Sequence, residues 1–233
     1  MRKRLIICFL LLSMLLCACQ SVPPETGDAG AGLITFPGTH WNMTPEELMT
    51  ALAIPETAVT VYLDEPRTAD NQVGTYQIGV DGMELYGYPA TVGFTFCAYT
   101  DDAPLGLSQV IVVYQDNADT EAIRQALGAE LGDPTGSHNT YPYVYWDSAK
   151  RLRDYMSEDA VETVRSNYLD NPNLPNGEEL LNNFLATPAV RLFWVNEPEI
   201  DLLSPPVSAG SNALCYTGSV TEMMQRYADA PAE

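Results

Sequence analysis

The chain of 233 residues carries 31 acidic and 11 basic side chains, which gives a formal net charge of −20 at pH 7. A surface of this sign repels polyanions, so nucleic acid is excluded as a partner and anionic lipid headgroups are unfavourable. Apolar residues make up 46% and aromatic residues 9% of the chain, so the sequence can build a hydrophobic core and does not have the composition of a disordered protein.

The first nineteen residues indicate where the protein works. Residues 2–4 are Arg-Lys-Arg, residues 5–16 are an apolar run too short to span a bilayer well, and the small Ala18 directly precedes Cys19. This order of segments is typical of a secretory signal peptide. Its end resembles the lipobox of bacterial lipoproteins, and the resemblance implies cleavage before Cys19 and lipidation of the Cys19 thiol. An ordinary signal peptide with an incidental cysteine is the alternative.

The chain accordingly divides into three parts. Residues 1–18 are the predicted signal peptide, residues 19–32 are rich in Pro, Gly and small polar residues and form a flexible tether, and residues 33–233 form a single domain. Two subdomains that meet near residues 135–140 are the alternative. Cleavage removes three cations, which leaves 8 basic and 31 acidic side chains and a formal charge of −23. Two acyl chains on Cys19 would hold the domain at the extracytoplasmic face of the cell membrane.

Two kinds of pattern predict the elements of the first half of the domain. Thr44 is a suitable N-cap and Glu47 completes a capping box three residues later, so a helix begins at Pro45. Alternating apolar residues then predict a β-meander from Val59 to Tyr114, in which Asp81-Gly82 has the composition of a hairpin turn.

The second half alternates between helices and strands. A helix capped by Asn117 or Asp119 ends at Gly132. Similar patterns predict the remaining elements, which are a strand at 141–146, helices at 157–168 and 178–186, a strand at 190–195 and a terminal helix opened by a capping box at 219–222. Short connections favour antiparallel pairing, so the expected fold class is α+β, an antiparallel β-meander sheet with helices packed mainly on one face.

Residues 41–48 (WNMTPEEL) and residues 131–134 (LGDP), separated by the meander, resemble two groups of proteins. One is the uncharacterised lipoproteins of Gram-positive bacteria with a W-x-M-[TS]-x-E-E helix start. The other is the SmpA/OmlA and β-lactamase-inhibitor-like fold, in which small helices pack on one face of an antiparallel sheet. This second resemblance covers about half of the chain, and the region after Tyr141 has no counterpart in it. It implies a protein that binds other proteins and has no active site.

A row of tyrosines is the most suggestive candidate for a binding surface. In a strand at 141–146, alternation places Tyr141, Tyr143 and Tyr145 on one face. Val144 and Trp146 lie on the other. Each tyrosine ring is apolar with a polar tip, so such a row can stack on sugar rings or contact a partner protein. Cross-strand aromatic packing inside the sheet is the alternative.

Cys97 and Cys215 are the two cysteines that remain beyond the leader and Cys19. In an exported chain they can form a disulfide, which would stabilise the fold by about 4 kcal/mol because the closed loop is long. Two buried free thiols are the alternative. His40 and His138 are not closely spaced with the cysteines, so the sequence predicts no zinc site and no cofactor.

The sequence contains no motif of nucleophilic catalysis. It has no Gly-x-Ser-x-Gly elbow, and the one lysine after the leader, Lys150, does not belong to a Ser-x-x-Lys motif. Acidic pairs occur at Asp101-Asp102 and at residues 116–121. The second group could bind Ca²⁺, although acidic residues are also expected at a helix N-terminus.

Three cations gather at Lys150, Arg151 and Arg153. Local ion pairing with the abundant acids is the expected role, and binding of an anionic group is the alternative. Together these features predict a membrane-anchored lipoprotein of the cell envelope that binds a protein or a glycan and is not an enzyme. An envelope hydrolase that uses paired carboxylates is the competing hypothesis.

Overall fold

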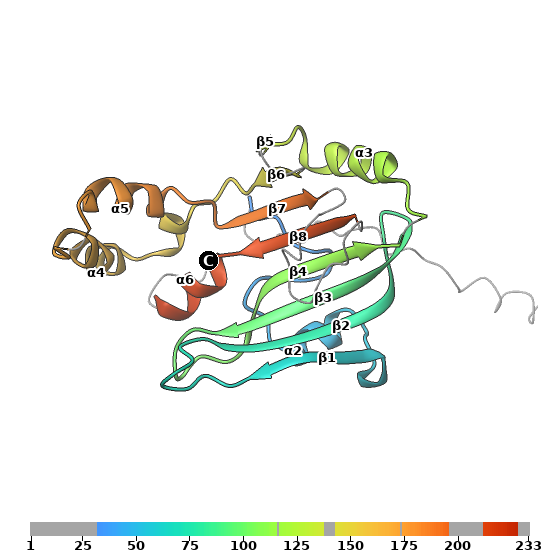
Figure 1. Ribbon diagram of the computed structural model, residues 1–233, viewed down its shortest axis with the longest axis horizontal. Coiled ribbons are helices and arrows are strands. Elements are labelled where there is room, and N and C mark those ends of the chain that lie inside the picture. The colour runs from blue at the N-terminus through green and yellow to red at the C-terminus, as the bar shows by residue number, and fades with distance from the viewer. Residues whose placement is uncertain (1–31, 116, 138–142, 173, 196–211, 228–233) are drawn as a thin grey trace, which may run out of the picture.

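The computed structural model describes residues 32–115, 117–137, 143–172, 174–195 and 212–227 (Figure 1). Its strands form one antiparallel sheet in the order β1-β2-β3-β4-β8-β7-β6-β5. The strands are β1 (Val59–Glu65), β2 (Gly74–Leu85), β3 (Tyr88–Ala98), β4 (Gly106–Tyr114), β5 (Gly136–Ser137), β6 (Tyr143–Asp147), β7 (Val190–Val195) and β8 (Ala213–Gly218). The helices are α2 (Pro45–Ala51), α3 (Thr120–Leu131), α4 (Glu158–Leu169), α5 (Gly177–Leu185) and α6 (Val220–Arg226), with 3₁₀ turns η1 (Glu56–Ala58) and η2 (Leu152–Tyr155).

Two meanders meet in the middle of this sheet. The predicted meander of residues 59–114 forms β1 to β4, and the second half of the chain adds β5 to β8. The two halves are joined where β4 pairs with β8, for example at Val110 and Tyr216. The α+β class and the antiparallel meander are therefore confirmed. Strand β8 was not predicted, yet it holds the centre of the sheet, and we retain a single domain as our interpretation.

The hydrophobic core lies on one face of the sheet. Phe36, from the segment before α2, packs edge to face against Phe94 of β3 and Tyr216 of β8, with ring centroids 5.7 and 5.9 Å apart. All five helices of the described residues contribute buried apolar side chains to this same core, among them Leu48, Ile123, Leu127, Val161, Val164, Leu181 and Met223. Figure 1 shows α2 behind β1 and β2. The prediction that the helices pack mainly on one face is thus confirmed.

Three of the predicted helix starts are built as the sequence indicates. Thr44 and Glu47 form the complete capping box of α2. The Asp119 carboxylate accepts hydrogen bonds from two backbone N–H groups of α3, and the Ser157 hydroxyl accepts one from α4. The capping box predicted at Ser219 is wrong, because Ser219 is already helical, with φ −61° and ψ −16°, and its side chain forms no capping bond.

The hairpin between β2 and β3 lies five residues beyond its predicted position. Asp81-Gly82 forms a bulge within β2, where the pairing register shifts between Val80 and Met83. The turn itself is at Tyr86-Gly87, whose φ angles of 55° and 82° are those of a type I′ turn. Thr91 of β3 donates to the Asp81 carboxylate at 2.6 Å and so fixes the bulge.

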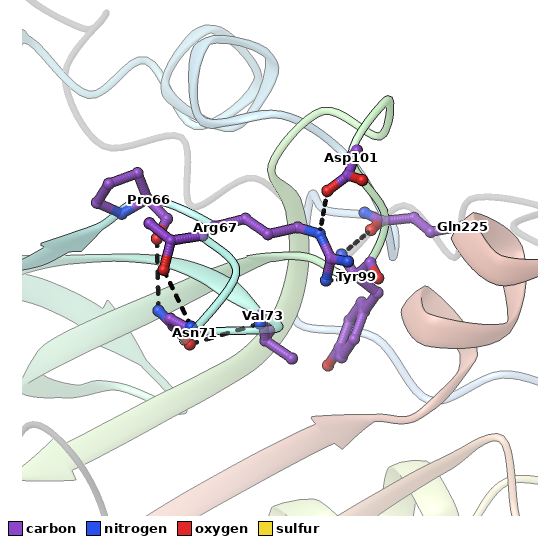
Figure 2. A network of polar contacts seen from close by, with 8 residues as sticks. Pro66, Arg67, Asn71, Val73, Tyr99, Asp101 and Gln225 are labelled. Atoms are coloured by element: carbon purple, nitrogen blue, oxygen red, sulfur yellow. Dashed lines mark hydrogen bonds and ion pairs between the residues drawn. The ribbon is translucent and has the colours of Figure 1, made fainter.

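A polar network ties the last helix to the sheet (Figure 2). The Gln225 side chain of α6 accepts a hydrogen bond from the Tyr99 N–H at 2.8 Å and donates one to the Asn42 side chain at 2.9 Å. Arg67, which follows β1, reaches the same loop and donates to Asp101 at 2.7 Å. The loop between β3 and β4 is thereby held between the start of the domain and its end.

Gly218 makes room for the Trp41 indole on the core face. A Cβ atom at Gly218 would lie 2.2 to 2.6 Å from three atoms of that ring, which is closer than real Cβ atoms come. The indole N–H donates to the Ile34 carbonyl at 2.9 Å, so the ring has little freedom to move away. The close approach of strand and ring therefore requires glycine.

Replacing Gly218 with alanine should lower the free energy of unfolding by about 1–3 kcal/mol, because the added methyl group overpacks the indole. The matched control is Gly128→Ala in α3, where a Cβ atom meets no heavy atom within 4 Å. That change should raise stability by up to about 1 kcal/mol, since alanine has the higher helix propensity. Urea denaturation of both variants measures the difference, and a Gly218→Ala protein as stable as the wild type would contradict the packing described.

Candidate functional site

The face of the sheet opposite the core has a different composition. Its apolar cluster is made of strand residues, with Ile111, Ala213 and Cys215 buried at its centre and Val113 and Phe193 packed against it. We call this surface the outer face. It contains the tyrosines that the sequence singles out, so it is the candidate binding surface.

Cross-strand pairing arranges the outer face in rows. Residues that pair across antiparallel strands project to the same side of the sheet. One row is polar and crosses six strands, from β6 to β2, through Asp147, Arg191, Thr217, Gln109, Thr95 and Gln77. The next row is largely apolar and runs through Tyr145, Phe193, Cys215 and Ile111. A polar strip therefore lies directly beside an apolar one.

Two of the three predicted tyrosines meet at Phe193 of β7. The Tyr143 ring packs edge to face against Phe193 with centroids 5.3 Å apart, and the Tyr145 ring lies 6.4 Å from it. Val144 and Trp146 pack against the core, so the predicted alternation of β6 is found. Tyr141 lies outside the described residues. Both tyrosines are half-buried, which combines cross-strand packing with partial access from outside.

An ion pair borders these rings. Arg191 donates from Nε to one oxygen of Asp147 at 2.5 Å and from Nη2 to the other at 2.9 Å, a two-pronged arrangement. The guanidinium carbon lies 4.4 Å from the centroid of the Tyr145 ring, within cation–π range. The hydrogen bond to Asp147 raises the pKa of Arg191. Arg191 is thus fixed in place by a carboxylate and an aromatic ring.

A hollow of about 330 Å³ opens beside Arg191. It is lined by three residues on the outer rows, Arg191, Phe193 and Thr217, and by Thr187, Pro188 and Ser219. This volume is at the lower end of the range for small-molecule sites. The lining combines one aromatic ring, one guanidinium and three hydroxyl groups, and we refer to it as the β7–β8 hollow.

Of the two possibilities left open for Cys97 and Cys215, the disulfide is not formed, because both thiols are free and buried. Cys97 pairs with Gly106 of β4 and Cys215 pairs with Ile111, five residues further along the same strand. At about 3.3 Å per residue, this separates them by roughly 16 Å, whereas a disulfide needs Cα atoms within about 7 Å. The alternative of two buried thiols is what the structure has.

The predicted ion pairing of the three clustered cations holds for one of them. Arg153 pairs with Glu158. All eight cations after the leader are described by the structure, and six of them have acidic partners within the described residues. Lys150 and Arg151 have none there. Two unpaired cations in so acidic a protein are unexpected on charge balance alone.

In each acidic group predicted from the sequence, at least one carboxylate has a structural role, and Asp116 lies outside the described residues. Asp101 pairs with Arg67, and Asp119 caps α3. Within the described residues, no three His, Cys, Asp or Glu side chains are placed to hold a metal ion. A shallow depression of about 550 Å³ at the start of α5 includes Glu178 and Glu179. Adjacent helical residues do not share a face, so these two carboxylates do not converge on one point.

Comparison of the chain with family models, with curated proteins and with solved structures found no match. In the part of the chain that the structure describes, none of the helices has the length and apolar character needed to cross a membrane.

Sequence reasoning missed Arg191, Phe193 and Thr217 as members of the site. Alternation in the predicted strand 190–195 places Arg191 and Phe193 on one face, and this was the available signal. It could not show that this face adjoins Tyr145, because the register between two strands separated by two helices is a tertiary property.

The two thiols give a direct test of the outer face. Burial raises the pKa of the Cys215 thiol to about 11, so at pH 8 it is almost entirely protonated and unreactive. We expect no alkylation of either thiol in the folded processed chain carrying Cys19→Ser, and alkylation of both after unfolding. The thermal midpoint should be the same with and without a reducing agent. A mass lower by two hydrogens, or a midpoint that falls on reduction, would contradict this.

Proposed function

We propose that this protein is a lipoprotein of the cell envelope that binds a glycan on the outer face of its sheet. The observation that carries the proposal is the β7–β8 hollow, in which Phe193 lies beside hydroxyl and guanidinium groups. A sugar ring has one apolar C–H face and a rim of hydroxyl groups. It therefore complements a surface on which an aromatic side chain adjoins hydrogen-bonding groups.

The size of the hollow favours a glycan over a protein partner. Stable protein–protein interfaces bury about 800 Å² on each side, typically around a large apolar patch. The large exposed apolar side chains of the described residues are Val61, Tyr62, Leu169 and Leu180, and they lie on β1, α4 and α5, away from the hollow. The outer face instead offers a small hollow beside the partly exposed Gln109 and Thr217.

The anchor places such a site in contact with envelope glycans. Cys19 and the leader lie outside the described residues, so this part of the proposal rests on the sequence pattern of residues 1–19. The competing hydrolase hypothesis needs carboxylates that converge in a pocket. Asp147 is the carboxylate nearest to the hollow in the rows described, and Arg191 occupies both of its oxygens.

Replacing Cys19 with serine should release the protein from membranes, because the acyl chains supply most of the membrane affinity. Fractionation of cells and metabolic labelling with a fatty acid measure the effect, with Ser21→Ala as a control that leaves the lipidation site intact. Continued sedimentation of Cys19→Ser with membranes, together with uptake of the label, would contradict the anchor.

Replacing Phe193 with alanine should weaken glycan binding about tenfold, since a stacked ring contributes on the order of 1.4 kcal/mol. The probe is an array of bacterial envelope oligosaccharides, and the protein is the processed chain of residues 19–233 with Cys19→Ser, which contains every described element. Tyr62→Ala on β1 is the matched control, because it removes an exposed aromatic ring at the far edge of the sheet. If the array binds no glycan and a protein is instead cross-linked through the outer face, the partner is a protein and the glycan proposal is contradicted.

A further inference from the structure

A second arginine pairs through its backbone with a residue that lines the hollow. Arg151 and Pro188 form an isolated antiparallel bridge, and Pro188 lines the β7–β8 hollow. Leu152 N–H donates to the Thr187 carbonyl at 2.9 Å, and Ala189 N–H donates to the Lys150 carbonyl at 3.0 Å. The short cationic segment therefore runs alongside residues 187–189, as a continuation of the β6–β7 pairing.

The bridge decides the side on which Arg151 projects. Arg151 has extended backbone, with φ −112° and ψ 163°, and residues opposite each other in an antiparallel pair point to the same side with Cβ atoms about 5 Å apart. Arg151 therefore leaves the backbone on the side of Pro188 and is exposed. Its backbone N–H is bonded to the Asp154 carboxylate at 2.8 Å, which fixes the main chain without neutralising the guanidinium by a salt bridge.

The two arginines at the hollow differ in their availability. Arg191 has a carboxylate across two of its nitrogens, so it presents a nearly neutral pair that can hydrogen-bond to hydroxyl groups. The Arg151 guanidinium forms no salt bridge within the described residues, so it can pair with an anion. An unpaired guanidinium is well suited to bind a carboxylate or phosphate with two parallel hydrogen bonds.

We propose that the glycan bound at the β7–β8 hollow carries an anionic group, a carboxylate or a phosphate, and that Arg151 contacts this group. This inference rests on the proposed glycan-binding function and names the class of glycan. The sugar ring lies against Phe193, and its acidic substituent extends past Pro188 to Arg151. Selection between acidic and neutral saccharides comes from this one contact.

The acidic surface of the protein is compatible with such a ligand. Charges are screened over about 8 Å at physiological ionic strength, so a ligand with a single anionic group responds mainly to the cations within that distance. A polyanion would extend over the acidic surface beyond the hollow and be repelled. The excess negative charge of the chain therefore works against polyanions and leaves a saccharide with isolated acidic groups as the favoured ligand.

The test is an array that displays acidic envelope oligosaccharides beside matched neutral forms, with carboxylates reduced to alcohols and phosphates removed. The processed chain of residues 19–233 with Cys19→Ser should bind the acidic forms about tenfold more tightly than the neutral forms. About a tenfold difference in affinity is what one good charge-assisted hydrogen bond contributes. Arg151→Gln should reduce this preference to twofold or less while leaving the affinity for neutral forms unchanged. The carboxylate and phosphate members of the array distinguish the two sources of charge.

The matched control is Arg165→Gln in α4, which changes the net charge equally but removes a cation already paired with Glu162 at 3.2 Å. It should leave the preference intact. Equal binding of acidic and neutral forms by the wild type, or a preference that survives Arg151→Gln, would overturn this inference and leave the proposed function standing. Binding of no saccharide at all would overturn the proposed function and this inference with it.

Discussion

The pairing of β4 with β8 is the constraint on which the rest of the structure depends. It joins the two meanders and fixes the register of both, with Val110 opposite Tyr216 and Ile111 opposite Cys215. Side chains of a strand alternate between faces, so a slip of one residue would exchange the buried and outer sets across half of the sheet. The helix-covered core and the rows of the outer face are two consequences of this single register.

The outer face differs from the core in its chemistry as well as in its position. The core face carries large aromatic and aliphatic side chains. The outer face instead has polar side chains, such as Gln109 and Thr217, beside a small apolar cluster around Ile111 and Cys215. The rings of Tyr143, Tyr145 and Phe193 lie together at its β6–β7 end. Arg191, Asp147 and Phe193 are brought together at that end by direct cross-strand pairing. In a protein with so few cations, Arg191 lines one hollow and Arg151 pairs through its backbone with Pro188 of the same hollow, and this is the main reason to place recognition there.

Local chemistry accounts for what the sequence predicted well. The capping box at Thr44 and the cap at Asp119 depend on bonds within four residues, and the alternation of Tyr143 and Tyr145 depends on strand geometry alone. Tertiary pairing accounts for what it missed. Strand β8 has a short sequence with Ala, Cys and Gly that shows little strand preference, and its partner lies about a hundred residues earlier. The bulge at Gly82 and the separation of Cys97 from Cys215 are likewise properties of register.

The most direct measurement is a crystal structure of the processed chain with an acidic envelope oligosaccharide bound. If the outer face is the recognition surface, a sugar ring will lie against Phe193, with hydroxyl groups at Thr217 and Ser219 and the acidic group at Arg151. A saccharide bound on another surface, with the β7–β8 hollow empty, would contradict the assignment of function to this face.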